Sequence, residues 1–153
     1  MRNRIWAAIG RLGAAAALCA LLSCASQTNT VAAPPRPGEQ VSGTLRAGQT
    51  KTLFQSGRET VIRSGLSMHG KVAESSTSRS IDFSREELSY LGLGADGRAK
   101  IQYRVLRGPL AQETERKEIA FDAQGATVRI ERGELSLGPA DVETLRYQAI
   151  AAP

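Results

Sequence analysis

The stretch Ile101-Gln102-Tyr103-Arg104-Val105 alternates apolar and polar side chains with a period of two residues. Successive side chains of a β-strand point to opposite faces, so this alternation predicts a strand with one apolar and one wet face. Strands with one wet face are typical of antiparallel sheets, because parallel sheets are usually covered on both sides. The stretch therefore predicts an antiparallel β-protein in which Tyr103 is buried.

The same alternation recurs in several other short runs of the chain. Its apolar positions are Ile119 and Phe121, Val128 and Ile130, Leu135 and Leu137, and Leu145, Tyr147 and Ala149. Glycine-bearing turn signals separate the runs, namely Ala47-Gly48-Gln49, Asp96-Gly97, Gln124-Gly125 and, as a break before the last run, Gly138-Pro139. Short strands joined by such turns predict a single all-β domain over residues 41–153, an antiparallel β-sandwich or small barrel of about 7–9 short strands.

One segment of this domain carries signals for two different structures. Ser84 and Glu87 have the spacing of a helical capping box, and Gly92 is a residue type that often ends helices. Leu91 and Leu93, in contrast, precede the Asp-Gly turn as the residues of a strand would. The segment predicts a short helical turn near residues 85–91 that leads into a strand.

The first residues of the chain have the composition of an export signal. Arg2, Arg4 and Arg11 precede or flank an uncharged run of eleven residues from Leu12 to Leu22. A positively charged start followed by a short apolar run is typical of a signal peptide, and the run is too short for a comfortable transmembrane helix. The segment ends in Leu21-Leu22-Ser23-Cys24.

This ending resembles the lipobox of bacterial lipoproteins, with an aliphatic residue, a small residue and then cysteine. The resemblance implies a signal peptide over residues 1–23, cleavage between Ser23 and Cys24, and acylation of Cys24. Several acyl chains would hold the protein stably on a lipid bilayer. Ala25 in place of aspartate resembles the pattern that sorts lipoproteins to the outer membrane, facing the periplasm. Two alternatives are an ordinary cysteine after an uncleaved anchor and a general signal peptidase site at Ser23-Cys24-Ala25.

Residues 24–40 predict a flexible tether, because small polar residues surround Pro34, Pro35 and Pro37 and offer little to a core. Removal of residues 1–23 lowers the basic residues from 20 to 17 against 15 acidic ones, which leaves a net charge of +2. Such a small excess is not typical of a nucleic-acid-binding protein. Cys24 is then the remaining cysteine, so no internal disulfide is expected.

The chain offers few residues for catalysis or metal binding. His69 is the single histidine, so a nucleophile triad would need it as the base and a metal site would lack convergent ligands. Two carboxylate groups, Glu86-Glu87 and Glu113/Glu115/Glu118, are interleaved with arginine and lysine, which is typical of a solvated face. No phosphate-binding loop occurs. The prediction is a domain without catalytic residues, metal or cofactor.

Three further features predict structural roles. The aromatic side chains beyond residue 23 mostly fall on the apolar phase of strands and are expected in the core. They are Phe54, Phe83, Tyr90, Tyr103, Phe121 and Tyr147. The polar run from Glu74 to Ser80 predicts a mobile loop, and the charged run from Glu113 to Glu118 predicts protection of an edge strand against pairing with other chains.

Two functional hypotheses from different classes remain open. The first is a lipid-anchored envelope protein that binds an envelope partner or supports an assembly without catalysis. The second is a small periplasmic hydrolase, or a binder of sugar or lipid, with His69 or an acidic pair in a pocket at the end of the sandwich. A closed polar pocket containing His69 and a carboxylate would favour the second hypothesis, whereas a solid core would favour the first.

Overall fold

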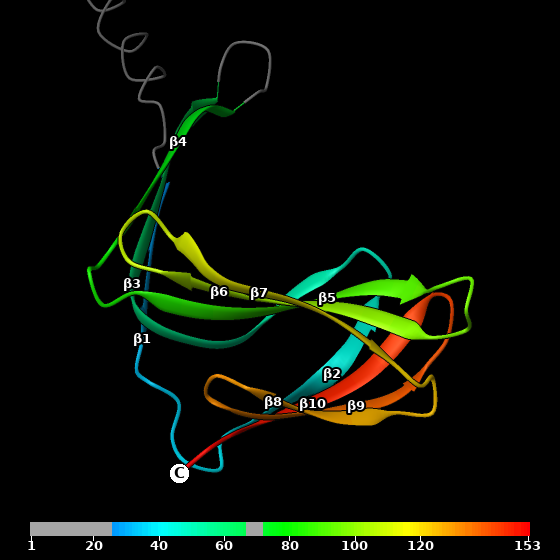
Figure 1. The fold of residues 1–153 in the computed structure, drawn as a ribbon. Helices are drawn as coiled ribbons and strands as arrows, with labels where there is room; N and C mark the ends of the chain where they lie inside the picture. The colour runs from blue at the N-terminus through cyan, green and yellow to red at the C-terminus, as the bar shows by residue number, and fades with distance from the viewer. Residues whose placement is uncertain (1–25, 67–71) are drawn as a thin grey trace, which may run out of the picture.

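The computed structural model describes residues 26–66 and 72–153, and within them the chain forms strands joined by turns. The strands are β1 (Ser26–Ala32), β2 (Gln40–Arg46), β3 (Thr50–Leu66), β4 (Val72–Arg79), β5 (Ser84–Leu93), β6 (Ala99–Arg107), β7 (Gln112–Phe121), β8 (Ala126–Ile130), β9 (Gly133–Ala140) and β10 (Thr144–Ala151). They form two antiparallel sheets that face each other as a β-sandwich rather than a closed barrel (Figure 1). The predicted all-β fold is confirmed.

The larger sheet has the order β1-β3-β5-β6-β7, with β4 also paired to β3, and the smaller sheet has the order β2-β10-β9-β8. Between the two sheets lies a core of alternating inward side chains, which includes Leu88, Ile101, Tyr103, Leu135 and Leu145. Tyr103 is fully buried, as its place in the alternation predicts. The six aromatic residues expected in the interior are all buried.

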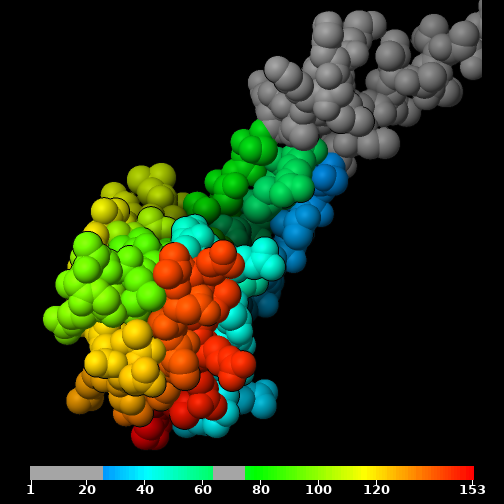
Figure 2. Space-filling view, turned by 90° about the vertical axis from the view of Figure 1, so that its right-hand side faces the viewer, coloured from blue at the N-terminus to red at the C-terminus, as the bar shows by residue number. Residues whose placement is uncertain are grey.

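The strand β3 belongs to two parts of the molecule. Its first part, Thr50 to Ser56, pairs with β5 in the sandwich. Its second part pairs with β1 on one edge and β4 on the other, and these three strands form an arm that extends away from the sandwich (Figures 1 and 2). We call this three-stranded extension the arm, and the place where it joins the sandwich the arm root.

The arm corrects two predictions about polar segments. Ser26–Ala32 was expected in the flexible tether of residues 24–40, but it pairs along its whole length with β3, from Ser26 opposite Arg63 to Ala32 opposite Gly57. The polar run within residues 74–80 was expected as a loop, but most of it belongs to β4. Neither segment has apolar alternation, since both lie in a sheet that is largely exposed on its two faces and pair through their backbones.

The ambiguous segment at residues 84–93 is strand β5 throughout, so the predicted helical turn near residues 85–91 is wrong. β5 is central in the larger sheet, and its backbone is paired to β3 and to β6. These two ladders outweigh the local capping signal of Ser84 and Glu87. A register shift lies between Tyr90 and Gly92, so Leu91 is at a bulge of the strand and is exposed.

Other expected features have clear places in the fold. β7 is an edge strand whose carboxylates and cations are mostly exposed, as the charged run from Glu113 to Glu118 predicts. Gly138-Pro139 lies inside β9 rather than between strands, so the predicted break is displaced to Asp141. Pro139 lies at the register shift between Leu145 and Tyr147 of the neighbouring β10. The regular ladder is interrupted there, so the missing backbone N–H of proline removes no ladder hydrogen bond.

Candidate functional site

The arm root depends on a sharp change of direction in β3. Gly57 has a φ of +88°, a conformation that residues with a side chain rarely adopt. A Cβ atom at this position would lie 2.7 Å from Cα of Phe83 and 2.9 Å from Oγ of Ser80. Glycine therefore allows the backbone of β3 to touch the turn between β4 and β5.

Charged side chains fix the arm to the sandwich above this contact. Glu59 of β3 accepts hydrogen bonds from Arg79 Nε of β4, at 2.8 Å, and from Arg85 of β5. The guanidinium groups of Arg79 and Arg85 each lie 5.2 Å from the centre of the buried Phe83 ring. Ion pairs and cation–π contacts therefore converge on one carboxylate and one ring, which holds the root of the arm in one orientation.

The ion pairs continue across the outer face of the larger sheet. Arg104 of β6 donates a hydrogen bond of 2.7 Å to Glu87 of β5, and its other terminal nitrogen lies 3.9 Å from Glu113 of β7. Glu113 also pairs with Arg116, at 2.7 Å. Glu113 is exposed, as predicted for a solvated face, whereas the Glu87 side chain is only 12% exposed beneath its arginine partners.

Glu86 does not belong to that face, so its assignment to a solvated surface is wrong. Its exposed fraction is 0%, and it occupies the inward phase of β5 together with Ser84, Leu88 and Tyr90. The reason is the strict alternation of the strand, which sends Glu86 and Glu87 to opposite faces. A buried carboxylate normally has polar partners, because burying an unpaired charge is unfavourable.

The two partners of Glu86 come from strand β6 and from the turn between β8 and β9. Tyr103 of β6 donates a hydrogen bond to Glu86 Oε2 at 2.6 Å, and its hydroxyl accepts the backbone N–H of Glu131 at 3.1 Å. Arg132, in the turn between β8 and β9, places Nε 3.3 Å from Glu86 Oε1. Arg132 also donates to Ser56 Oγ at 3.0 Å. We call Ser56, Glu86, Tyr103 and Arg132 the buried cluster.

The buried cluster changes the acidity of its members. Burial raises the pKa of Glu86, against the hydrogen bond from Tyr103 and the charge of Arg132, which both lower it. Burial and the nearby carboxylate also raise the pKa of the Tyr103 hydroxyl, which therefore remains a hydrogen-bond donor. Among the described residues, Glu86 Oε1, Ser84 Oγ and Arg132 Nη1 have no hydrogen-bond partner. Two of these three atoms, Glu86 Oε1 and Arg132 Nη1, belong to the buried cluster, which therefore has one acceptor and one donor without a hydrogen bond.

The substitution Glu86→Gln is expected to remove a pH dependence of stability. Because folding raises the pKa of Glu86 above its ordinary value of 4.5, its contribution to stability is greatest below that value and is lost as the pH rises through the folded-state pKa. The free energy of unfolding of the variant minus that of the wild type should therefore increase from about pH 4 upward and then level off. Urea unfolding between pH 4 and pH 8 measures this difference, and a constant difference would contradict the expectation.

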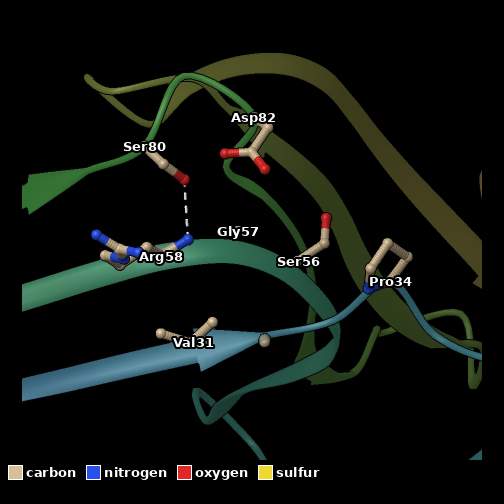
Figure 3. Close-up of a pocket in the computed structure, with 8 residues that line it drawn as sticks. Val31, Pro34, Ser56, Gly57, Arg58, Ser80 and Asp82 are labelled. Carbon is tan, nitrogen blue, oxygen red and sulfur yellow. Dashed lines mark hydrogen bonds between the residues drawn. The ribbon is translucent and has the colours of Figure 1, made fainter.

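A cavity of about 470 Å³ lies at the arm root beside the buried cluster. Its wall comes from β1 and the link that follows it, from the bend of β3, and from the turn between β4 and β5 (Figure 3). The lining residues are Val31, Ala32, Pro34, Ser56, Gly57, Arg58, Ser80 and Asp82. Ser56 connects the two features, because it lines the cavity and accepts the hydrogen bond from Arg132. We call this the arm-root cavity.

The predicted site residues have different positions relative to this cavity. Cys24, Ser23 and His69 lie outside the described residues. Glu113, Glu115 and Glu118 lie on edge strand β7 and not at the cavity. Within residues 26–66 and 72–153, no group of three or more His, Cys, Asp or Glu side chains is arranged to hold a metal ion. The structure in that part of the chain also contains no helix long and apolar enough to cross a membrane.

Sequence reasoning missed Ser56, Asp82 and Arg132. No motif marks them, because they come from three separate turns or bends that only the fold brings together. For Glu86 a signal was present, since the alternation of Ser84, Glu86, Leu88 and Tyr90 places the carboxylate on the apolar phase. That signal was masked by the adjacent arginine and glutamate, which suggested a solvated face.

Comparison with known proteins adds no relative. No protein-family model, no curated protein and no solved structure matches this chain. The features that bear on function are therefore the sequence of the first 24 residues, the arm, the buried cluster and the arm-root cavity.

Proposed function

We propose that this chain is a membrane-anchored bacterial envelope lipoprotein that acts as a non-enzymatic binding or accessory assembly module. In this proposal the acylated Cys24 holds the protein on the membrane, and the sandwich faces the periplasm, on the outer membrane. An envelope protein is the expected partner, and neither nucleic acid nor a cofactor is involved. The sequence Leu21-Leu22-Ser23-Cys24 after an apolar run supports the anchor.

The observation that carries the proposal is the direction of β1. Ala32 lies opposite Gly57 at the arm root, whereas Ser26 lies opposite Arg63, farther out along the arm. β1 begins two residues after Cys24, so the chain leads from the outer part of the arm toward the anchor. Seven residues of strand span about 20 Å. The arm would then act as a spacer of paired strands that keeps the sandwich away from the bilayer.

The substitution Cys24→Ser tests the anchor. Because the thioether to the lipid requires a thiol, we expect the variant to leave the membrane fraction or to accumulate as an uncleaved precursor. Cell fractionation and the mass of the protein measure these outcomes. Cys19→Ser is the matched control, since Cys19 lies within the apolar run and should leave anchoring unchanged. A Cys24→Ser protein that is cleaved and membrane-bound like the wild type would exclude the lipoprotein proposal.

Site-specific crosslinking tests whether the arm contacts an envelope protein. A photoreactive residue at Thr28 of β1 or Thr77 of β4, both exposed, should give a discrete adduct with an envelope protein in intact cells. The matched control position is Glu134 on the smaller sheet, which is also exposed and lies outside the arm. An adduct that depends on Cys24 and is specific to the arm supports the proposal. Equal labelling from all three positions would contradict it.

A second candidate function is a small periplasmic hydrolase or a binder of sugar or lipid. The specific observation in its favour is the arm-root cavity, whose lining residue Ser56 accepts a hydrogen bond from Arg132. Arg132 in turn lies 3.3 Å from the buried carboxylate of Glu86. A hydrolase would lose activity on a chromogenic glycoside or ester in the Glu86→Gln variant. A protein that only binds sugar or lipid would instead hold its ligand without changing it chemically.

A further inference from the structure

The hydroxyl groups of the arm-root cavity have protons left to donate. Ser56 Oγ accepts a hydrogen bond from Arg132 Nη2 at 3.0 Å, and a guanidinium cannot accept one in return. Ser80 Oγ accepts the backbone N–H of Arg58 at 2.8 Å. In the described part of the chain, neither hydroxyl donates a hydrogen bond to another protein group. Ser56 is only 7% exposed, so its unused donor is held in place at the cavity wall.

The same cavity offers an acceptor of hydrogen bonds. Asp82 lies in the turn between β4 and β5, and Figure 3 shows its carboxylate beside the opening that Ser56 and Ser80 border. Asp82 takes part in no ion pair with the residues that the structure describes. Ionised carboxylates accept hydrogen bonds only, so the cavity combines two hydroxyl donors with one strong acceptor.

Apolar groups complete the cavity and its surroundings. Val31 is 73% exposed and lines the cavity together with Pro34. Ile81, between Ser80 and Asp82, is 88% exposed. Exposed apolar side chains gathered beside convergent polar groups are characteristic of small-molecule sites, whose volumes are usually about 300–1,000 Å³.

We propose that the arm-root cavity binds one ring of a neutral saccharide. Each sugar hydroxyl both donates and accepts, which matches the donors Ser56 and Ser80 and the acceptor Asp82. The C–H face of the ring would pack on Val31 and Pro34. Asp82 and Arg58 both line the cavity, so their opposite charges balance, and a neutral ligand is favoured over an anion or a cation. This inference deepens the second candidate function and does not depend on the lipid anchor.

An array of immobilised neutral oligosaccharides, probed with the full chain in detergent, tests the inference. We expect binding to at least one glycan, followed by at least a tenfold weaker affinity for Asp82→Asn in a calorimetric titration with that glycan. Glu143→Gln and Ser42→Ala are the matched controls, because both residues are exposed and lie away from the cavity. Both control variants should bind like the wild type.

A second variant keeps the test independent of hydrogen bonding. Val31→Glu places a longer, charged side chain in the cavity at an exposed position, so it should abolish binding without loss of the fold. The melting temperature of each variant verifies folding. Absence of binding to every neutral glycan would overturn the saccharide site. Binding of Asp82→Asn and Val31→Glu with the affinity of the wild type would also overturn it. Binding confined to anionic glycans would also overturn it, and none of these results would affect the anchor tested through Cys24.

Discussion

Replacement of Tyr103 by alanine is expected to lower the free energy of unfolding by about 4–5 kcal/mol, near the upper end of the cost of removing a buried aromatic side chain. Tyr103 is fully buried between the sheets, so its ring would leave a cavity. Its hydroxyl also links Glu86 of the larger sheet to the N–H of Glu131 beside the smaller sheet. Urea unfolding of the variant and the wild type measures the loss.

The substitution Tyr103→Phe separates the hydrogen bonds from the ring. It keeps the packing but leaves Glu86 Oε2 without its donor and the N–H of Glu131 without its acceptor, so we expect a loss of about 1–3 kcal/mol. The matched control is Tyr147→Phe, since Tyr147 is also buried but has no side-chain hydrogen bond among the described residues. It should cost less than about 1 kcal/mol. Equal losses for both Tyr→Phe variants would show that the buried cluster does not join the two sheets.

The burial of Tyr103 illustrates what the sequence predicts well. Its side chain lies on the apolar phase of a regular strand, and neighbouring strands repeat the same phase. Because one face of each strand must be covered, the alternation determines both the strand and the buried face. The charged edge strand β7 was predictable for a related reason, since an unprotected edge is open to pairing with other chains.

The buried cluster could not be assembled from sequence alone. Glu86 lies between Arg85 and Glu87, and three adjacent charged residues predict three solvent-exposed side chains. Its actual environment depends on Arg132, which is distant in sequence and approaches only when the β8–β9 turn covers the end of the sandwich. The contact between Glu86 and Arg132 depends on the topology of the strands, and the local sequence pattern does not indicate it.

The arm was missed because its stability has a different origin. β1 and β4 are rich in small polar residues and lack the apolar phase that identified the other strands. They become strands because the second part of β3 leaves the sandwich with both of its edges free for backbone pairing. Sequence patterns report side-chain burial more directly than backbone pairing, so such strands resemble loops and tethers.

The substitution Gly57→Ala is expected to lower the free energy of unfolding by about 2–5 kcal/mol and to loosen the arm. Two effects add at this position. An alanine at a φ of +88° costs roughly 1–2 kcal/mol, and the contact of its Cβ with the backbone of Phe83 forces a shift that costs about 1–3 kcal/mol more. The shift would also disturb Ser80, whose hydroxyl accepts a hydrogen bond from the backbone N–H of Arg58 at the arm root.

The substitution Gly48→Ala provides the matched control for the contact. Gly48 has a φ of +78°, close to that of Gly57, but nothing lies within 4 Å of a Cβ at that position. It should therefore cost only the conformational part, roughly 1–2 kcal/mol. Hydrogen exchange of the β1 amides should accelerate in Gly57→Ala and not in Gly48→Ala, because only Gly57 lies opposite β1. Equal effects of the two substitutions on stability and exchange would show that the bend of β3 tolerates a side chain, and that the close approach to Phe83 does not fix the direction of the arm.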